Sequence, residues 1–341
     1  MNPETLLLTG DDVRALLPVE DCIAAVEQAF RSFAGGDATP PAVLGVHVGE
    51  GGFHVKAAAL RLGRWYFAAK LNGNFPRNPA RTGLPTIQGV VALCDADDGR
   101  LLALLDSIEI TRLRTGAATA VAARYLARPE ASVLTLFGCG GQGRAQVECL
   151  ARVLPLRRVF AHDSDPQAAD RLVAWAATAL GLQATALDAP GAMRAARESD
   201  VIVTCTPARR YFLTRSEVRP GSFVAGVGAD DAGKQELAPE LLAASTLVTD
   251  VLEQCATIGD LHHALVAGTL RREAVHAELA QVVAGSKRGR RSADEITVFD
   301  STGTALEDVA AAAVAYERAL ASGRGLALRL AGTSPSEREA T

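Results

Sequence analysis

Six residues near the middle of the chain could hold the pyrophosphate of a dinucleotide. They read Gly138-Cys139-Gly140-Gly141-Gln142-Gly143 and match the pattern G-x-G-x-x-G. The pattern follows an apolar run at 133–137 and opens a stretch with helical periodicity. Gly138 permits the tight turn, Gly140 lets the backbone approach a pyrophosphate, and Gly143 lets the helix pack closely on the strand. Because the first N–H groups of a helix favour an anion, a dinucleotide site is predicted here.

An acidic residue follows at a spacing that suits a ribose. Asp163 comes directly after the expected strand 158–162, about 20 residues beyond Gly143, where a carboxylate can accept both ribose hydroxyls. Asp165 adds a negative charge that repels a 2′-phosphate. The sequence therefore predicts NAD in preference to NADP as the cofactor. The alternative interpretation of 163–166 is a capping turn before the next helix.

Polar residues also follow three later strands of the expected parallel sheet, in the stretches 203–207, 227–234 and 299–303. Ligands of open α/β sheets bind beyond the carboxyl ends of the strands. We therefore expect cofactor contacts from Thr204, Thr206, Val227 and Ser301. Asp230 follows a glycine that permits close approach of a ligand, and it could deliver or remove a proton there. Asp231 and Lys234 are interpreted as a solvated turn.

Lysine is rare in this chain. Of the 35 basic residues only four are lysines, namely Lys56, Lys70, Lys234 and Lys287. Where arginine serves as the usual surface cation, a retained lysine suggests a need for a compact or deprotonatable amine. Lys287 lies in a basic loop and is interpreted as solvated.

The elements that must position these residues divide into two sets. From 132 to 303, apolar strands alternate with helical stretches, which is the pattern of a doubly wound, Rossmann-type parallel sheet. Before it come an amphipathic helix at 19–33, short strands with turns between them, and a long helix at 107–127. A capping box predicts a final helix from 304 to about 322 that returns to the first domain. We expect an α/β protein with a dinucleotide-binding domain at 128–303 and a discontinuous α+β substrate-binding and dimerisation domain at 1–127 and 304–341.

Composition excludes several classes of function. A net charge of −4 gives no field for attracting a polyanion, so nucleic acid is not an expected partner. No apolar run is long enough for a membrane helix, and we expect no membrane association and a cytoplasmic location. The six cysteines are scattered without a C-x-x-C pair, which favours free thiols over disulfides and predicts no metal site. A small molecule is the expected ligand.

Several segments together resemble the ornithine cyclodeaminase and mu-crystallin family over nearly the whole chain. They are the glycine motif and the segments 69–72 (Ala-Lys-Leu-Asn), 83–86 (Gly-Leu-Pro-Thr), 111–117 (Thr-Arg-Leu-Arg-Thr-Gly-Ala), 228–230 (Gly-Ala-Asp), 233–237 (Gly-Lys-Gln-Glu-Leu) and 298–301 (Val-Phe-Asp-Ser). The resemblance implies a homodimer that acts on an α-amino acid or its imine. It implies Lys70 and Arg114 at the substrate carboxylate, Asp230 as acid or base at the substrate nitrogen, Lys70 as a second catalytic group, and Thr86 and Thr115 near the cofactor.

The chain departs from the cyclodeaminase pattern at the substrate end. An arginine expected near Val43 is missing, His54 stands where an acid is expected, and Lys56 takes a position that is often Met. Lys56 is therefore a further candidate for binding a carboxylate, either the α-carboxylate or a second one. Three functions stay open: an NAD-dependent amino-acid dehydrogenase or imine reductase, which is the leading hypothesis; a redox-neutral ornithine or lysine cyclodeaminase; and a mu-crystallin-like protein that binds cofactor and ligand with little turnover.

Overall fold

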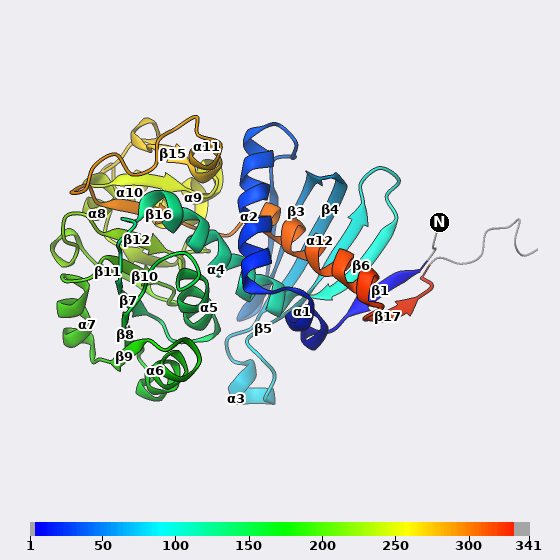
Figure 1. Ribbon diagram of the computed structural model, residues 1–341, viewed down its shortest axis with the longest axis horizontal. Coiled ribbons are helices and arrows are strands. Elements are labelled where there is room, and N and C mark those ends of the chain that lie inside the picture. Colours follow the sequence, from blue (N-terminus) through cyan, green and yellow to red (C-terminus); the bar gives the residue numbers. More distant parts are fainter. Residues whose placement is uncertain (1–3, 331–341) are drawn as a thin grey trace, which may run out of the picture.

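The computed structural model describes residues 4–330, which form two lobes (Figure 1). One lobe contains an eight-stranded, entirely parallel sheet in the order β15-β14-β16-β12-β10-β7-β8-β9. Its strands are β7 (Val133–Phe137), β8 (Arg158–His162), β9 (Gln183–Ala186), β10 (Val201–Thr204), β12 (Phe223–Gly226), β14 (Thr246–Thr249), β15 (Ala277–Glu278) and β16 (Thr297–Asp300). The order reverses direction beside β7, which places a ligand crevice between β7 and β10.

Helices cover both faces of this parallel sheet, as expected for strands that are buried throughout. They are α5 (Gly141–Leu150), α6 (Pro166–Leu180), α7 (Ala189–Ala196), α8 (Pro239–Ala243), α9 (Leu252–Ile258), α10 (Asp260–Val266) and α11 (Leu279–Val283). Two 3₁₀ turns, Arg215–Glu217 and Arg272–Ala274, and a small parallel pair, β11 (Arg209–Leu213) with β13 (Gln235–Leu237), complete the lobe. The small parallel pair and the short β15 are absent from the sequence prediction.

The other lobe is built on a seven-stranded mixed sheet in the order β17-β1-β6-β5-β4-β3-β2. The strands are β1 (Thr5–Leu8), β2 (Ala42–Val48), β3 (Gly51–Leu62), β4 (Arg64–Asn74), β5 (Ile87–Asp95), β6 (Leu101–Asp106) and β17 (Leu326–Leu328). All neighbouring strands are antiparallel except β1 and β6, so the expected antiparallel character is confirmed for β2 to β6. The helices of this lobe are α1 (Gly10–Leu16), α2 (Val19–Ala34), α3 (Asn78–Thr82), α4 (Ser107–Leu126) and α12 (Ala305–Ser322).

Helix α4 joins the two lobes and is buried along most of its length. Its small residues let other helices approach closely: a Cβ added to Gly116 would lie 2.7 Å from the carbonyl oxygen of Ala145 in α5. One apolar core runs from β3, β4 and α2 through α4 to β7 and β8, and a second core fills the other face of the parallel sheet. Strand β7, which precedes the glycine motif, and strands β3 and β4, which carry Lys56 and Lys70, thus share one core with helix α4.

Helix α12 leaves the parallel sheet and returns to the mixed sheet, where it packs against α2, β3 and β4 (Figure 1). Thr304 and Glu307 form the expected capping box at its start. The α/β class, with its doubly wound sheet, is therefore confirmed. The domain boundaries at 127/128 and 303/304 stay a prediction that these contacts support, and residues 1–3 and 331–341 of that prediction lie outside the described chain.

Candidate active site

A cavity of about 910 Å³ opens between the two lobes, at the carboxyl ends of the parallel strands. Strands β3 and β4 and helix α4 supply one wall, and the ends of β12 and β16 supply the other. Nine of the residues expected from the sequence line it: Lys56, Lys70, Thr86, Arg114, Thr115, Gln142, Val227, Asp230 and Ser301. Residues from five separate parts of the sequence therefore meet where the fold class predicts a ligand.

The mixed sheet presents two lysines side by side. Lys56 of β3 and Lys70 of β4 are direct cross-strand partners, so both side chains leave the same face of the sheet. Val43 of β2 is the next partner in this row. The arginine expected near Val43 is missing, but Lys56 on the neighbouring strand places a cation close to that position.

Two carboxylates of helix α12 neutralise Lys70 and Arg114. Lys70 Nζ lies 2.9 Å from Oδ2 of Asp308, and Arg114 Nε lies 3.0 Å from Oδ1 of the same residue. Arg114 Nη1 also donates to Glu307 at 2.7 Å. All four side chains are almost completely buried. The two cations are therefore fixed in place and keep spare N–H groups for a ligand.

Burial changes the protonation of this cluster. Burial, together with repulsion from Arg114, lowers the pKa of Lys70 to about 7. Burial raises the pKa of Glu307 to about 7, although the Arg114 guanidinium opposes the rise. Burial also acts to raise the pKa of Asp308, but the ammonium of Lys70 and the guanidinium of Arg114 outweigh it, so that this pKa is lowered. Lys70 can therefore change its protonation near neutral pH, as a catalytic amine requires.

Lys56 is held differently, by backbone alone. Its Nζ donates to the carbonyl oxygens of Thr302 at 2.9 Å and Gly303 at 2.7 Å, and among residues 4–330 no carboxylate lies within ion-pair distance of it. The carboxylate of Asp250 accepts from both N–H groups of this turn and holds it in place. Burial and the nearby Arg114 lower the pKa of Lys56. The side chain is only 9% exposed, and it lines the cavity.

Asp230 lies on the opposite wall, where its side chain is 51% exposed to the cavity. Its Oδ1 accepts from Lys234 Nζ at 2.6 Å. Partial enclosure acts to raise the pKa of Asp230. The ammonium groups of Lys234 and Lys56 outweigh this effect, so the pKa is lowered. Lys234 closes the expected turn, since its N–H donates to the carbonyl oxygen of Asp231, but its ammonium also lines the cavity and pairs with Asp230. Asp231 does form a turn, accepting from the N–H of Gly233.

A buried carboxylate that the sequence analysis overlooked ties the strand-end loops together. Glu236 of β13 accepts from the hydroxyl groups of Thr204 and Thr206 and from the N–H groups of Thr206 and Gly228. The two threonine hydroxyls therefore bind Glu236 in this structure, and Thr204 is fully buried. Direct cofactor contacts by Thr204 and Thr206 stay a prediction. Their observed role is to position the loop that carries Asp230.

The glycine motif has the geometry that a pyrophosphate needs. Gly138 has φ +99°, a region that favours glycine, and a Cβ on Gly143 would lie 2.1 Å from the Gly138 carbonyl oxygen. A Cβ on Gly140 or Gly141 would meet nothing within 4 Å, so open space lies before the start of α5. No side chain caps that helix start, and its N–H groups are available to an anion.

Further polar groups fit a dinucleotide. The hydroxyl of Ser301, on a residue only 1% exposed, and the side-chain oxygen of Gln142 have no hydrogen-bond partner, and both residues line the cavity. Asp163 follows β8 and accepts from the N–H of Cys139 at 2.7 Å, which connects it to the glycine loop. Asp165 caps α6, and Asp163 accepts from the N–H of Asp165 at 2.9 Å, so the turn interpretation holds for both residues. A contact between Asp163 and a ribose stays a prediction. The residues present fit the predicted cofactor.

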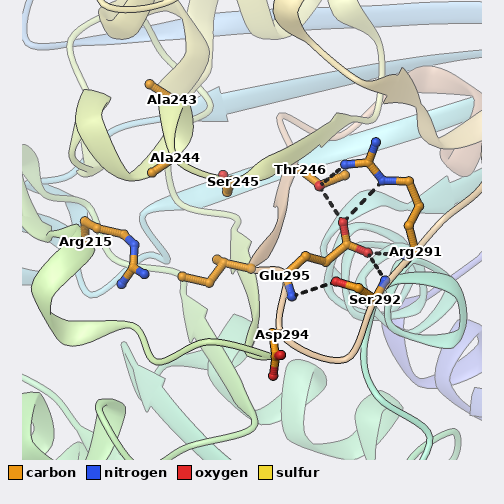
Figure 2. Close-up of a pocket in the computed structure, with 10 residues that line it drawn as sticks. Arg215, Ala243, Ala244, Ser245, Thr246, Arg291, Ser292, Asp294 and Glu295 are labelled. Carbon is orange, nitrogen blue, oxygen red and sulfur yellow. Dashed lines mark hydrogen bonds and ion pairs between the residues drawn. The ribbon is translucent and has the colours of Figure 1, made fainter.

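A second, more open pocket lies at the amino ends of β14 and β16 (Figure 2). Its polar groups largely satisfy one another: the Glu295 carboxylate accepts from Thr246, Arg291 and the N–H of Ser292. Within residues 4–330, no cluster of three or more histidine, cysteine or acidic side chains could hold a metal ion, and no helix is long and apolar enough to cross a membrane. The six cysteines are free.

The sequence analysis missed Asp308, Asp250 and Glu236, and it recognised Glu307 only as a helix cap. An available signal was the pair Glu307-Asp308 on an Ala-rich helix, since two acids facing a core require cations as partners. Their partners lie more than 190 residues away in sequence. Only the fold brings them together.

A parallel sheet with a glycine-rich first turn, facing a lobe that presents clustered cations, defines a two-lobed dinucleotide-binding protein. Residues 3–323 match the ornithine cyclodeaminase/mu-crystallin family, and the chain belongs to that family.

Three relatives illustrate the range of this family. An archaeal alanine dehydrogenase, solved as a dimer with bound NAD, is 39% identical and superposes with a TM-score of 0.91 over 96% of this chain and 100% of its own. The Δ(1)-pyrroline-2-carboxylate reductase of Thermococcus litoralis, solved with NADH and L-proline, is 31% identical, with a TM-score of 0.89 over 94% and 99%. The iminosuccinate reductase of Paracoccus denitrificans is 36% identical over 94% of this chain and 98% of its own.

Proposed function

We propose that this chain is an NAD-dependent oxidoreductase that acts at the Cα–N bond of an α-amino acid or its imine, as an amino-acid dehydrogenase or a ketimine reductase. One observation carries the proposal: Lys70, Arg114 and Asp230 line a single cavity at the end of the dinucleotide-binding sheet. The cofactor supplies hydride chemistry when it is bound. The related structures with NAD and NADH support the choice of cofactor.

The roles follow from the positions of the side chains. Arg114 and Lys70 offer charged donors to the α-carboxylate, since each keeps N–H groups beyond those used by Asp308 and Glu307. Asp230, on the opposite wall, exchanges a proton with the substrate nitrogen through its free Oδ2. Protonation of an imine nitrogen makes its carbon electrophilic. The buried, fixed cations hold that carbon toward the strand ends where the nicotinamide ring would lie.

The decisive experiment follows NADH absorbance with purified protein. Pyruvate with ammonium, Δ(1)-pyrroline-2-carboxylate and L-alanine with NAD test the oxidoreductase directly. L-ornithine tests the cyclodeaminase alternative, which forms proline without a net change in NADH. Proline formation at constant NADH would overturn the proposal, and absence of turnover on the whole panel would favour the ligand-binding alternative.

We also propose a homodimer joined through the outer face of the mixed sheet. Every residue of β2 is exposed, including Leu44 at 59% and Val46 at 48%, and Phe53 and Leu71 add exposed apolar surface. A soluble monomer rarely leaves an apolar sheet face open. Leu44→Glu with Val46→Lys should convert a dimer into a monomer in light scattering; a wild-type monomer at micromolar concentration would contradict this proposal. A cytoplasmic location stays a prediction.

A further inference from the structure

The charges of the cavity point to the class of substrate, a deduction that rests on the proposed function. On the wall made by the mixed sheet, three cations face two carboxylates, since Lys56, Lys70 and Arg114 are set against Glu307 and Asp308. On the opposite wall, Asp230 and Lys234 neutralise each other. Among residues 4–330, Lys56 is the cation of the mixed-sheet wall that has no carboxylate within ion-pair distance.

Lys56 differs from the other two cations in its partners. Lys70 and Arg114 each have a carboxylate partner, whereas Lys56, a residue that is 9% exposed, donates to the carbonyl oxygens of Thr302 and Gly303. A buried ammonium without a counter-ion is costly unless an anion joins it. Two of its N–H groups are used by the carbonyls, which leaves one for a ligand.

A substrate with one carboxylate, bound by Lys70 and Arg114, leaves the ammonium of Lys56 without an anion. A second carboxylate on the substrate supplies the counter-ion that Lys56 lacks. Cross-strand neighbours have Cβ atoms about 5 Å apart, so Lys56 and Lys70 can hold the two ends of a short dicarboxylic acid.

The remaining lining also suits a polar side chain. Among the described residues that line the cavity, only Pro76, Ile87, Pro207 and Val227 carry apolar side chains, and His54, Asn72 and Asn74 occupy the face beside the two lysines. A side-chain amine would add charge of the wrong sign beside Lys56.

We propose that the substrate is a short dicarboxylic amino acid or the corresponding imino acid, and that Lys56 binds its second carboxylate while Lys70 and Arg114 bind the first. Lys56 is then the residue that determines specificity for the side chain.

The test compares oxaloacetate with pyruvate, each with ammonium and NADH, as a ratio of kcat/KM. Wild type should prefer oxaloacetate by at least about tenfold, and Lys56→Met should lower the ratio by at least about tenfold, because a desolvated charge contact is lost. Lys56→Arg should retain most of the preference. Arg209→Gln is the matched control, since it removes a cation from the exposed part of the same cavity, and it should change the ratio less than about threefold.

Three results would overturn the inference: a wild-type preference for pyruvate, equal losses with both substrates in Lys56→Met, or an effect of Arg209→Gln as large as that of Lys56→Met. If Lys56→Met does not fold, the wild-type ratio decides alone. Calorimetric titration of the NADH-loaded protein with L-aspartate and L-alanine separates this inference from the proposed function. Preferred binding of L-aspartate that depends on Lys56, without any turnover, would support the inference while the oxidoreductase proposal fails.

Discussion

At the scale of single residues, the site separates fixed charge from mobile protons. Arg114 and Asp308 are buried and paired, and they hold their charges over a wide pH range. Asp230 is half exposed to the cavity, and Lys70 has a pKa of about 7. Both groups line the cavity, and they are the two that we propose to exchange protons with a ligand.

Asp230→Asn should lower turnover by about 100-fold or more while NADH affinity stays near that of wild type, because an amide cannot exchange the proton. Steady-state kinetics and a fluorescence titration with NADH measure the two effects. Asp231→Asn is the matched control, since that neighbouring carboxylate also lines the cavity but accepts from the N–H of Gly233 in an exposed turn. Near-normal turnover of the Asp230 variant would assign the proton transfer to another group.

Lys234→Gln should move the acidic limb of the pH profile of kcat/KM to higher pH. The ammonium of Lys234 lowers the pKa of Asp230, so its removal lets that pKa rise, although partial solvation of the pair limits the effect. Lys234→Arg keeps the charge and should keep the limb in place. An unmoved limb in the glutamine variant would show that Asp230 does not control it.

At the scale of elements, features within one continuous segment could be predicted from the sequence, whereas contacts between distant segments could not. The glycine motif, its strand and its helix form one continuous segment, so spacing alone located them, and β7 and β8 match the expected ranges residue for residue. Lys70 and Asp230 were found from composition, strand ends and resemblance. Asp308 was missed because its cationic partners lie on β4 and α4, and only the packing of α12 against that lobe creates the pairing.

The contact between β7 and α5 should tolerate no side chain at Gly143. Gly143→Ala places a Cβ 2.1 Å from a backbone carbonyl oxygen, which should lower the free energy of unfolding by about 2 kcal/mol or more and weaken NAD binding. Gly140→Ala is the control, because its Cβ meets open space: stability should stay near wild type while NAD binding alone weakens. Urea unfolding and NADH titration measure both variants, and a Gly143→Ala protein as stable as wild type would contradict the packing argument.

At the scale of the whole molecule, buried acids at the strand ends link stability to pH. Burial raises the pKa of Asp300 to about 7, and it also raises the pKa values of Asp260 and Glu236. A folded-state pKa above the unfolded value gives a stabilising contribution that is complete below about pH 4 and is lost as pH rises through 7. These groups therefore favour the folded state at mildly acidic pH.

The free energy of unfolding should accordingly fall by about 1 to 4 kcal/mol between pH 5 and pH 8. Urea unfolding at several pH values measures the slope. In Asp300→Asn this slope should flatten, even though the variant loses stability at pH 5, because an amide does not titrate. An unchanged slope in the variant would place the pH dependence elsewhere.

The return of α12 to the mixed sheet also bears on how the protein is made. Glu307 and Asp308 come after the entire dinucleotide-binding lobe in the chain, yet they secure Arg114 and Lys70, which are synthesised much earlier. During translation the nucleotide-binding turn can form well before these early cations acquire their counter-charges. Premature termination before α12 would therefore leave two cations without their counter-charges, which opposes stable folding.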